Sequence, residues 1–209
     1  NRLAEKVFRD FEKGGIAVHE TRRLILRLSD EVEAGQVLAY YERNRDFFKP
    51  YEPERPRGFF TLENQQMYLL RDQENLEGRR GMRFWLSRQE EPEEIMGTIA
   101  LNGIMWGGFR SSFVGYKLDC NHAAKGYMTE ALGQVVSIAF HQLKLHRLEA
   151  NVMHRNYAAV RVVEKLGFEE EGISRKYMNI NGRWEDHVHM VILNPAVENS
   201  VEEPVRLWY

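Results

Sequence analysis

Apolar residues recur along the chain with two spacings, and the changes between these spacings predict the order of its elements. Residues 21–28, "TRRLILRL", place leucines on alternate positions, which is typical of a half-buried strand. Residues 30–48 carry apolar side chains at helical spacing, and "KPYEPERP" (49–56) ends that helix because prolines cannot continue one. A second helix is predicted from a cap at Thr61 to about residue 77.

The second half of the chain alternates predicted strands with predicted helices. In order, these are strands at 83–89, 94–105 and 111–119, a helix at 126–143, a strand at 147–153, a helix capped by Asn156 and ended by Gly167, and a hairpin turning at 181–182. Because a helix connects the strand ending near Leu118 with the strand at 147–153, we expect these two strands to be parallel. The pattern therefore predicts an α/β protein with a mixed sheet.

Length and charge narrow the classes of function. The 209 residues suit one main domain at 16–195, preceded by an amphipathic helix at 1–15 and followed by a tail at 196–209. The formal charge of -2 argues against direct nucleic-acid binding, and we find no apolar run of membrane-spanning length. A single cysteine, Cys120, cannot form an internal disulfide, so we expect a cytoplasmic protein.

The loop between the strand at 111–119 and the helix at 126–143 is the first candidate for chemistry. Ligands of open α/β sheets bind beyond the carboxyl ends of parallel strands, where this loop and Asn156 both lie. Its small side chains and a lysine, "AAKG", allow backbone amides at the helix start to approach an anion the size of a diphosphate. A plain turn without a ligand explains the same residues equally well.

Three separated motifs carry a resemblance to a known family. "VGYKLDCNHAAKGYMTEAL", "HRLEANVMHRNYAAVRVVEKLGFEEEG" and "INGRWEDHV" together resemble the GNAT superfamily of N-acetyltransferases, and within it the RimJ/RimL type that acetylates ribosomal proteins. The resemblance spans about residues 20 to 195. It implies a GNAT fold, in which helices flank a mixed central sheet with splayed parallel strands, and an acetyl-coenzyme A donor. It also implies a primary-amine acceptor.

The acceptor is left open by the sequence. The N-terminal α-amine of a protein, such as a ribosomal protein, is the interpretation that the resemblance favours. A small-molecule amine, as in detoxification or antibiotic resistance, is the alternative, and a coenzyme A-binding module with little turnover is a third. Either a monomer or a homodimer fits the sequence.

The resemblance also implies a set of cofactor contacts. Lys117 and Leu118 would offer strand backbone to the pantetheine amides, and Asn156 would hydrogen-bond nearby. Ala124 replaces the first glycine of the family's loop, so we expect either a negative φ there or weaker cofactor binding. The pyrophosphate loop would comprise Asn121, Ala123, Ala124, Lys125, Gly126, Tyr127, Met128 and Thr129.

Glu149 is the candidate proton acceptor for catalysis. It shares the polar face of its strand with Asn151 and could take the amine proton directly or through water. A structural carboxylate paired with Arg147 or Arg155 is the alternative. Many members of the type carry a serine at the position of Ala159, which protonates the departing thiolate. In this chain Tyr157 or water would protonate the thiolate instead, or the thiolate would leave without an acid.

The acceptor groove is the least determined part. Its candidates are Phe47, Phe48, Tyr51, Trp106, Asp186 and His187, for each of which packing or hairpin bracing is an equal explanation. His187 and His189 share one strand face without an identifiable third ligand, so we expect no metal site. Cys120 has no base beside it, which disfavours an acyl-carrying role.

Overall fold

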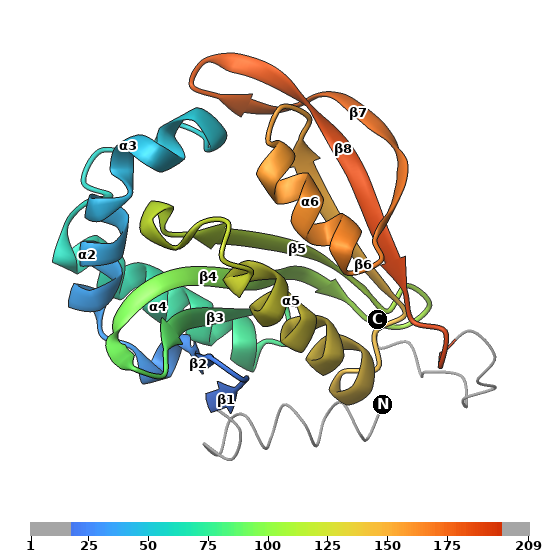
Figure 1. The fold of residues 1–209 in the computed structure, drawn as a ribbon, viewed down its shortest axis with the longest axis horizontal. Coiled ribbons are helices and arrows are strands. Elements are labelled where there is room, and N and C mark those ends of the chain that lie inside the picture. The colour runs from blue at the N-terminus through green and yellow to red at the C-terminus, as the bar shows by residue number, and fades with distance from the viewer. Residues whose placement is uncertain (1–17, 198–209) are drawn as a thin grey trace.

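A single mixed sheet of eight strands forms the centre of the molecule (Figure 1). The computed structural model describes residues 18–197, and the expected helix at 1–15 and most of the tail at 196–209 lie outside them. The strand order is β1-β2-β3-β4-β5-β6-β8-β7, and among the strands of these described residues only the β5–β6 pair is parallel. The strands are β1 Val18–Glu20, β2 Leu24–Leu28, β3 Gly81–Arg88, β4 Glu91–Met105, β5 Ser111–Leu118, β6 Arg147–Met153, β7 Glu169–Ile180 and β8 Arg183–Leu193.

The helices follow the predicted order with two corrections. They are η1 Ser29–Glu31, α2 Ala34–Arg43, α3 Arg45–Phe48, η2 Lys49–Tyr51, α4 Leu62–Glu77, η3 Cys120–His122, α5 Tyr127–Ser137, η4 Ile138–Gln142 and α6 Tyr157–Lys165. The helix expected at 30–48 breaks at Asn44, whose side chain turns inward to donate to Asp119 Oδ2 at 2.9 Å. The helix expected at 126–143 ends as a π-helical turn, in which the Leu143 amide donates to the Ile138 carbonyl.

Two apolar clusters hold the helices against opposite faces of the sheet. Helices α5 and α6 pack over the larger cluster, which includes the fully buried leucines of β2. Helices α2 and α4 pack over the smaller, aromatic cluster around Tyr40 and Trp85. The alternation in "LILRL" therefore places Leu24, Leu26 and Leu28 in the core as predicted.

The local signals at turns and caps are confirmed. The Thr61 and Asn156 side chains accept from the amides of Asn64 and Ala159, as helix caps do. The β7–β8 hairpin turns at Asn181 and Gly182, whose φ values of 50° and 82° match the left-handed turn that "NG" predicts.

The parallel strands β5 and β6 part soon after they begin. Their ladder pairs only Ser111–Phe113 with Arg147–Glu149, after which β5 continues to Leu118 without β6 beside it. Figure 1 shows the two ribbons diverging, with α6 and the β7–β8 hairpin carried away from β5. Glu149 thus occupies the last paired position before the strands separate. Of the helices in residues 18–197, none is both long and apolar enough to cross a membrane.

Candidate functional site

The loop after β5 is held in place by the buried carboxylate of Asp119. Asp119 is fully buried and accepts from Arg43 Nε at 2.6 Å, from Asn44 Nδ2, and from the Asn121 amide at 2.8 Å. Burial opposes its ionisation, yet the hydrogen bonds from Asn44, Arg43 and Asn121 together hold the pKa of Asp119 below its usual value. Helix α2 therefore fixes the position at which β5 ends.

A second set of contacts ties the start of α5 to the segment between β1 and β2. Glu130, in the first turn of α5, accepts from the hydroxyl of Thr21 at 2.7 Å and from both the amide and Nε of Arg23. The Arg23 guanidinium also donates to the Lys125 carbonyl and lies 4.3 Å from the centre of the Tyr127 ring. Arg23, which the sequence did not single out, thus brings a cation to the start of α5.

The backbone of the loop is left-handed at two positions. Gly126 has a φ of +80°, and Ala124 has a φ of +59°. Of the two alternatives expected at Ala124, the negative φ is therefore wrong, and weaker cofactor binding stays a prediction. The reason is conformational, because the chain must leave η3 and enter α5 within four residues. In anion-binding nests a left-handed residue turns successive amides toward one side, and Ala124 and Gly126 are two such residues, whereas Ala123 is extended.

The first turn of α5 has donors to spare. No side chain caps this helix, and the amides of Tyr127, Met128 and Thr129 have no intrahelical acceptor, because the first intrahelical bond runs from the Glu130 amide to the Gly126 carbonyl. The helix dipole adds roughly half a positive charge at this end. Lys125 folds back so that its Nζ donates to the Asn121 carbonyl at 2.8 Å. An anion at this corner would meet backbone amides, Lys125 and Arg23.

The exposed backbone of β5 is not quite where the resemblance suggested. The Asp119 amide donates to the Met96 carbonyl at 2.7 Å, so alternate residues of β5 face β4. By this alternation the backbone N–H and C=O of Lys117 face β4. Those of Leu118 and Tyr116 face the other way, toward the gap that opens between β5 and β6. The Lys117 side chain forms an ion pair with Glu52 on the opposite face from α5. Tyr116 was missed by the sequence analysis.

Tyr116 also links the two arms of the parted sheet. Its hydroxyl donates to the Ala159 carbonyl of α6 at 2.7 Å, and burial raises the pKa of this phenol well above its usual value. Ala159 has no hydroxyl to offer, and its amide is used by the Asn156 cap at 3.3 Å. Tyr157, at the start of α6, is 70% exposed. The structure thus places Asn156 and Tyr157 at the end of β6 where the strands are apart.

Glu149 lies in a polar cluster that spans β6, β8 and β7. Its Oε2 is 2.9 Å from His189 Nε2, and its Oε1 is 3.4 Å from Arg147 Nε. His189 Nδ1 lies 2.7 Å from Asn151 Oδ1, and the Asn151 amide donates to the Tyr177 hydroxyl at 3.0 Å. The Arg147 pairing expected as the structural alternative is therefore present.

Arg155, the other partner considered for Glu149, pairs elsewhere. Its guanidinium donates to Glu185 and to the Pro50 carbonyl, each at 3.2 Å. Arg147 binds Glu171 as well as Glu149, and this lowers the pKa of Glu171. His189 and Tyr177 were not recognised as neighbours of Glu149. The register explains His189, because Asn151 pairs directly with it across β6 and β8, and Tyr177 joins through its hydrogen bond with Asn151.

The aromatic acceptor candidates divide between the surface and the core. Phe47 and Tyr51 are 43% and 40% exposed, whereas Phe48 is buried in the smaller cluster. Trp106 does not join them, because it packs against the larger cluster and donates to the Arg79 carbonyl in the α4–β3 turn. Its place in the acceptor groove stays a prediction.

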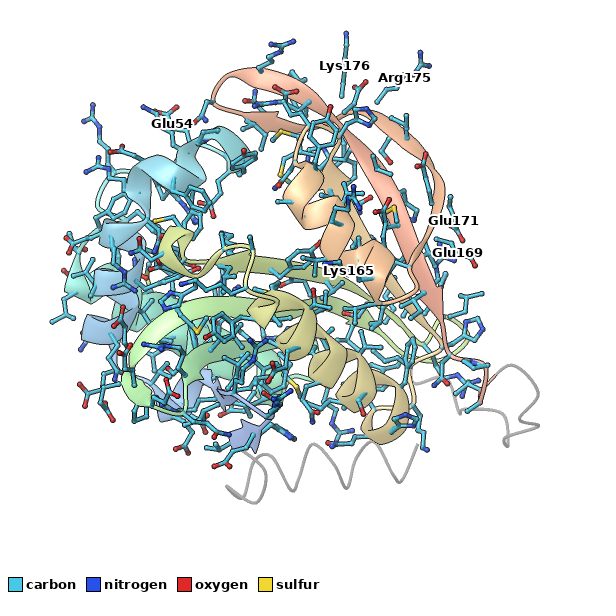
Figure 2. All side chains as sticks on the ribbon, in the orientation of Figure 1. Glu54, Lys165, Glu169, Glu171, Arg175 and Lys176 are labelled. Carbon is cyan, nitrogen blue, oxygen red and sulfur yellow. The ribbon has the colours of Figure 1, made fainter. Side chains whose placement is uncertain are left out.

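The segment after α3 is held against the tip of the β7–β8 hairpin. The Asn181 amide donates to the Lys49 carbonyl, and Arg155 binds the neighbouring Pro50 carbonyl. A cavity of about 600 Å³ lies here, and its lining includes Phe48, Glu52 and Asn181. Figure 2 shows Glu54, from the segment after η2, at the same end of the molecule as Arg175 and Lys176 in β7.

Asp186 and His187 have structural partners within the hairpin. The Asp186 carboxylate accepts from the Lys176 amide at 2.8 Å, which braces β7 against β8. His187 is 4% exposed, and its ring lies 5.1 Å from that of Tyr177. Cys120 is an exposed free thiol in η3. Within residues 18–197 there is no group of three His, Cys, Asp or Glu side chains placed to hold a metal ion.

Comparisons with known proteins agree with this geometry. Residues 23–169 match the model of the acetyltransferase (GNAT) domain family. The chain is 41% identical over 177 residues to the probable N-acetyltransferase YjcK of Bacillus subtilis (strain 168), covering 85% of this chain and 97% of the relative. It is 31% identical to the ribosomal protein uS5-alanine N-acetyltransferase of Escherichia coli (strain K12), covering 84% of this chain and 90% of that one.

Solved structures give the same result for the fold. Ribosomal-protein-S5-alanine acetyltransferase from Vibrio fischeri superposes with a TM-score of 0.80 at 33% identity, covering 85% of this chain and 97% of the other. RimJ of Mycobacterium smegmatis, in complex with a coenzyme A disulfide, superposes with a TM-score of 0.77 at 23% identity, covering 88% and 90%. Spermidine N-acetyltransferase from Vibrio cholerae, with coenzyme A and spermine, reaches 0.69 at 23% identity, covering 83% and 97%.

Proposed function

Because the chain belongs to the GNAT family of acetyltransferases, we propose that it moves an acetyl group from acetyl-coenzyme A to the N-terminal α-amine of a protein. The bound cofactor supplies an acetyl thioester, and this chain's own residues bind it, orient the amine and remove a proton. A ribosomal protein is the acceptor that the uS5-alanine relatives suggest.

The single observation that carries the proposal is the uncapped start of α5 beside a left-handed loop. The amides of Tyr127, Met128 and Thr129 have no intrahelical acceptors, and Lys125 and Arg23 add positive charge. These residues fit the pyrophosphate of coenzyme A. The peptide groups of Leu118 and Tyr116, turned toward the parted strands, fit the pantetheine amides. Asn156, the N-cap of α6, lies on the other side of the gap between β5 and β6.

Proton removal is assigned to Glu149. An α-amine with a pKa of about 7.8 is roughly one-tenth neutral at pH 7, whereas a lysine amine near 10.4 is almost entirely charged. A carboxylate therefore suffices as the base for an α-amine, directly or through one water. Glu149 lies on the face opposite α5, at the last paired position of the parallel strands.

The acceptor is tested with acetyl-coenzyme A and matched peptides. One peptide has a free N-terminal alanine, and its control has the same sequence with a blocked N-terminus and an internal lysine. We expect thiol release only with the free N-terminus, and mass spectrometry should place the acetyl group on the α-amine. Release with spermidine but with neither peptide would indicate a small-molecule acetyltransferase, and cofactor binding without release a binding module.

The role of Glu149 is tested by Glu149→Gln. We expect kcat to fall by on the order of a hundredfold, because a positioned base typically contributes that much or more. The loss should be greatest at low pH, where little of the acceptor amine is neutral. An unchanged rate and pH profile would remove Glu149 from the mechanism and leave the acetyl transfer itself standing.

A further inference from the structure

We propose that His189 is a positioning residue, which holds the Glu149 carboxylate in the orientation that receives the proton of the acceptor amine. Asn151 and Tyr177 in turn hold His189. This inference rests on the proposed function, because it assigns a partner to the base of that reaction. Its test below separates its failure from failure of the acetyl transfer.

The four side chains form a continuous chain across three strands. His189 Nε2 is 2.9 Å from Glu149 Oε2, and His189 Nδ1 is 2.7 Å from Asn151 Oδ1. The Asn151 amide reaches the Tyr177 hydroxyl at 3.0 Å, and Tyr177 is 42% exposed. Because Asn151 and His189 are direct register partners, the β6–β8 ladder fixes this contact rather than side-chain rotation alone.

The hydrogen-bond pattern requires a hydrogen on His189 Nε2. When Asn151 Oδ1 faces the ring, Nδ1 donates to it, and a bare Nε2 lone pair would then oppose the carboxylate at 2.9 Å. When the Asn151 amide is turned over, Nδ1 accepts and the neutral ring carries its hydrogen on Nε2. In both arrangements Nε2 donates to Glu149.

Two further charged residues, Arg147 and Glu171, surround the pair of Glu149 and His189. Arg147 Nε lies 3.4 Å from Glu149 Oε1, and the same guanidinium binds Glu171 on β7. Glu171 Oε2 is 3.9 Å from His189 Nε2, so it also faces the imidazole. Arg147 Nη2 also lies 3.5 Å from Glu149 Oε2 and 3.5 Å from His189 Nε2. Among residues 18–197, Arg147 is therefore the donor that remains on Glu149 when His189 is removed. His189 holds Oε2 from the neighbouring strand.

Two polar substitutions of similar size separate positioning from packing. In His189→Gln the amide nitrogen reaches about as far as Nε2, so it can still donate to Glu149. In His189→Asn the amide reaches only as far as Nδ1, so it can bind Asn151 but not Glu149. We expect His189→Asn to lower kcat by about 10- to 100-fold with KM for acetyl-coenzyme A unchanged. His189→Gln should keep nearly the wild-type kcat.

The pH profile and a double variant complete the test. Loss of a donor to the ionised carboxylate should move the acid limb of the kcat profile of His189→Asn to higher pH. In a Glu149→Gln background, His189→Asn should have no further effect on kcat, because the group it positions is gone. Glu169→Gln, an exposed position of the same sheet edge (Figure 2), serves as a control that matches wild type.

The outcomes are separable. Equal kcat and equal pH profiles for His189→Asn, His189→Gln and wild type would overturn the positioning role while acetyl transfer remains intact. Equal losses in Asn and Gln variants, additive with Glu149→Gln, would likewise overturn it and indicate a packing role. No thiol release from wild type with any peptide or amine would instead refute the proposed function.

Discussion

The left-handed backbone at Ala124 predicts that replacing this alanine with glycine stabilises the protein, whereas glycine substitutions usually lower the free energy of unfolding. Ala124 has a φ of +59° and an exposed side chain, so replacing it with glycine removes a strained Cβ and almost no buried surface. The strain of an L-residue in this region is roughly 1–2 kcal/mol. The greater freedom of glycine in the unfolded chain opposes this by roughly 0.5–1 kcal/mol.

The difference lies between about 0 and 1.5 kcal/mol, and its midpoint predicts that Ala124→Gly raises the free energy of unfolding by about 0.75 kcal/mol. For a chain of this size, the midpoint corresponds to a rise in Tm of about 1–3 °C. Urea denaturation and calorimetry without cofactor measure the effect.

The neighbouring alanine supplies a matched control. Ala123 is also exposed, but its φ of -61° lies in a region that any residue adopts. Ala123→Gly therefore gains no relief and should lower the free energy of unfolding by about 0.5–1 kcal/mol. If Ala124→Gly destabilises the protein as much as Ala123→Gly, the strain at residue 124 does not exist in solution and the reasoning fails.

Three further predictions follow from the contacts around the loop and hairpin. Tyr116→Phe removes the bond to the Ala159 carbonyl and should cost about 1 kcal/mol of unfolding free energy in denaturant titrations. Asp119→Asn should destabilise the protein at pH 7. The pKa of Asp119 is lower in the folded protein, so the stability that its carboxylate contributes is present above the unfolded-chain pKa of about 3.9 and is lost as pH falls through the folded pKa. The difference in unfolding free energy between Asp119→Asn and wild type should therefore close in acid. A difference that stays constant with pH would contradict this. Gly182→Ala, at a φ of 82°, should lower the Tm, whereas the same exchange at Gly35, where nothing lies within 4 Å of an added Cβ, should raise it.

Periodicity and caps were enough to predict the fold in outline. The 3.6-residue pattern at 126–143 and the alternation in 147–153 located α5 and β6, since both bury one face against the same cluster. The two helix corrections had causes that lie far away in the sequence. Asn44 interrupts α2 and α3 because Asp119, 75 residues later, takes its amide. No local pattern contains that information.

The candidate site divides in the same way. The loop residues could be predicted because small side chains before a helix are a local signal, although the φ of Ala124 could not. Arg23 at the loop is non-local, since 107 residues separate it from Glu130. His189 and Tyr177 needed the register of three strands, which only the folded sheet defines.

The parting of β5 and β6 explains why so many tertiary contacts collect around this site. After Phe113 and Glu149 no backbone ladder joins the two strands, so the loop and the Glu149 cluster lie on separate arms of the sheet. A reaction between groups on separate arms requires each arm to be rigid by itself. Asp119 stiffens the β5 arm, and the polar cluster across β6, β8 and β7 stiffens the other. The Tyr116 hydroxyl then sets the distance between them, because its partner carbonyl belongs to α6. On this view the side-chain network around the parted strands replaces the ladder hydrogen bonds that the parallel pair gives up there.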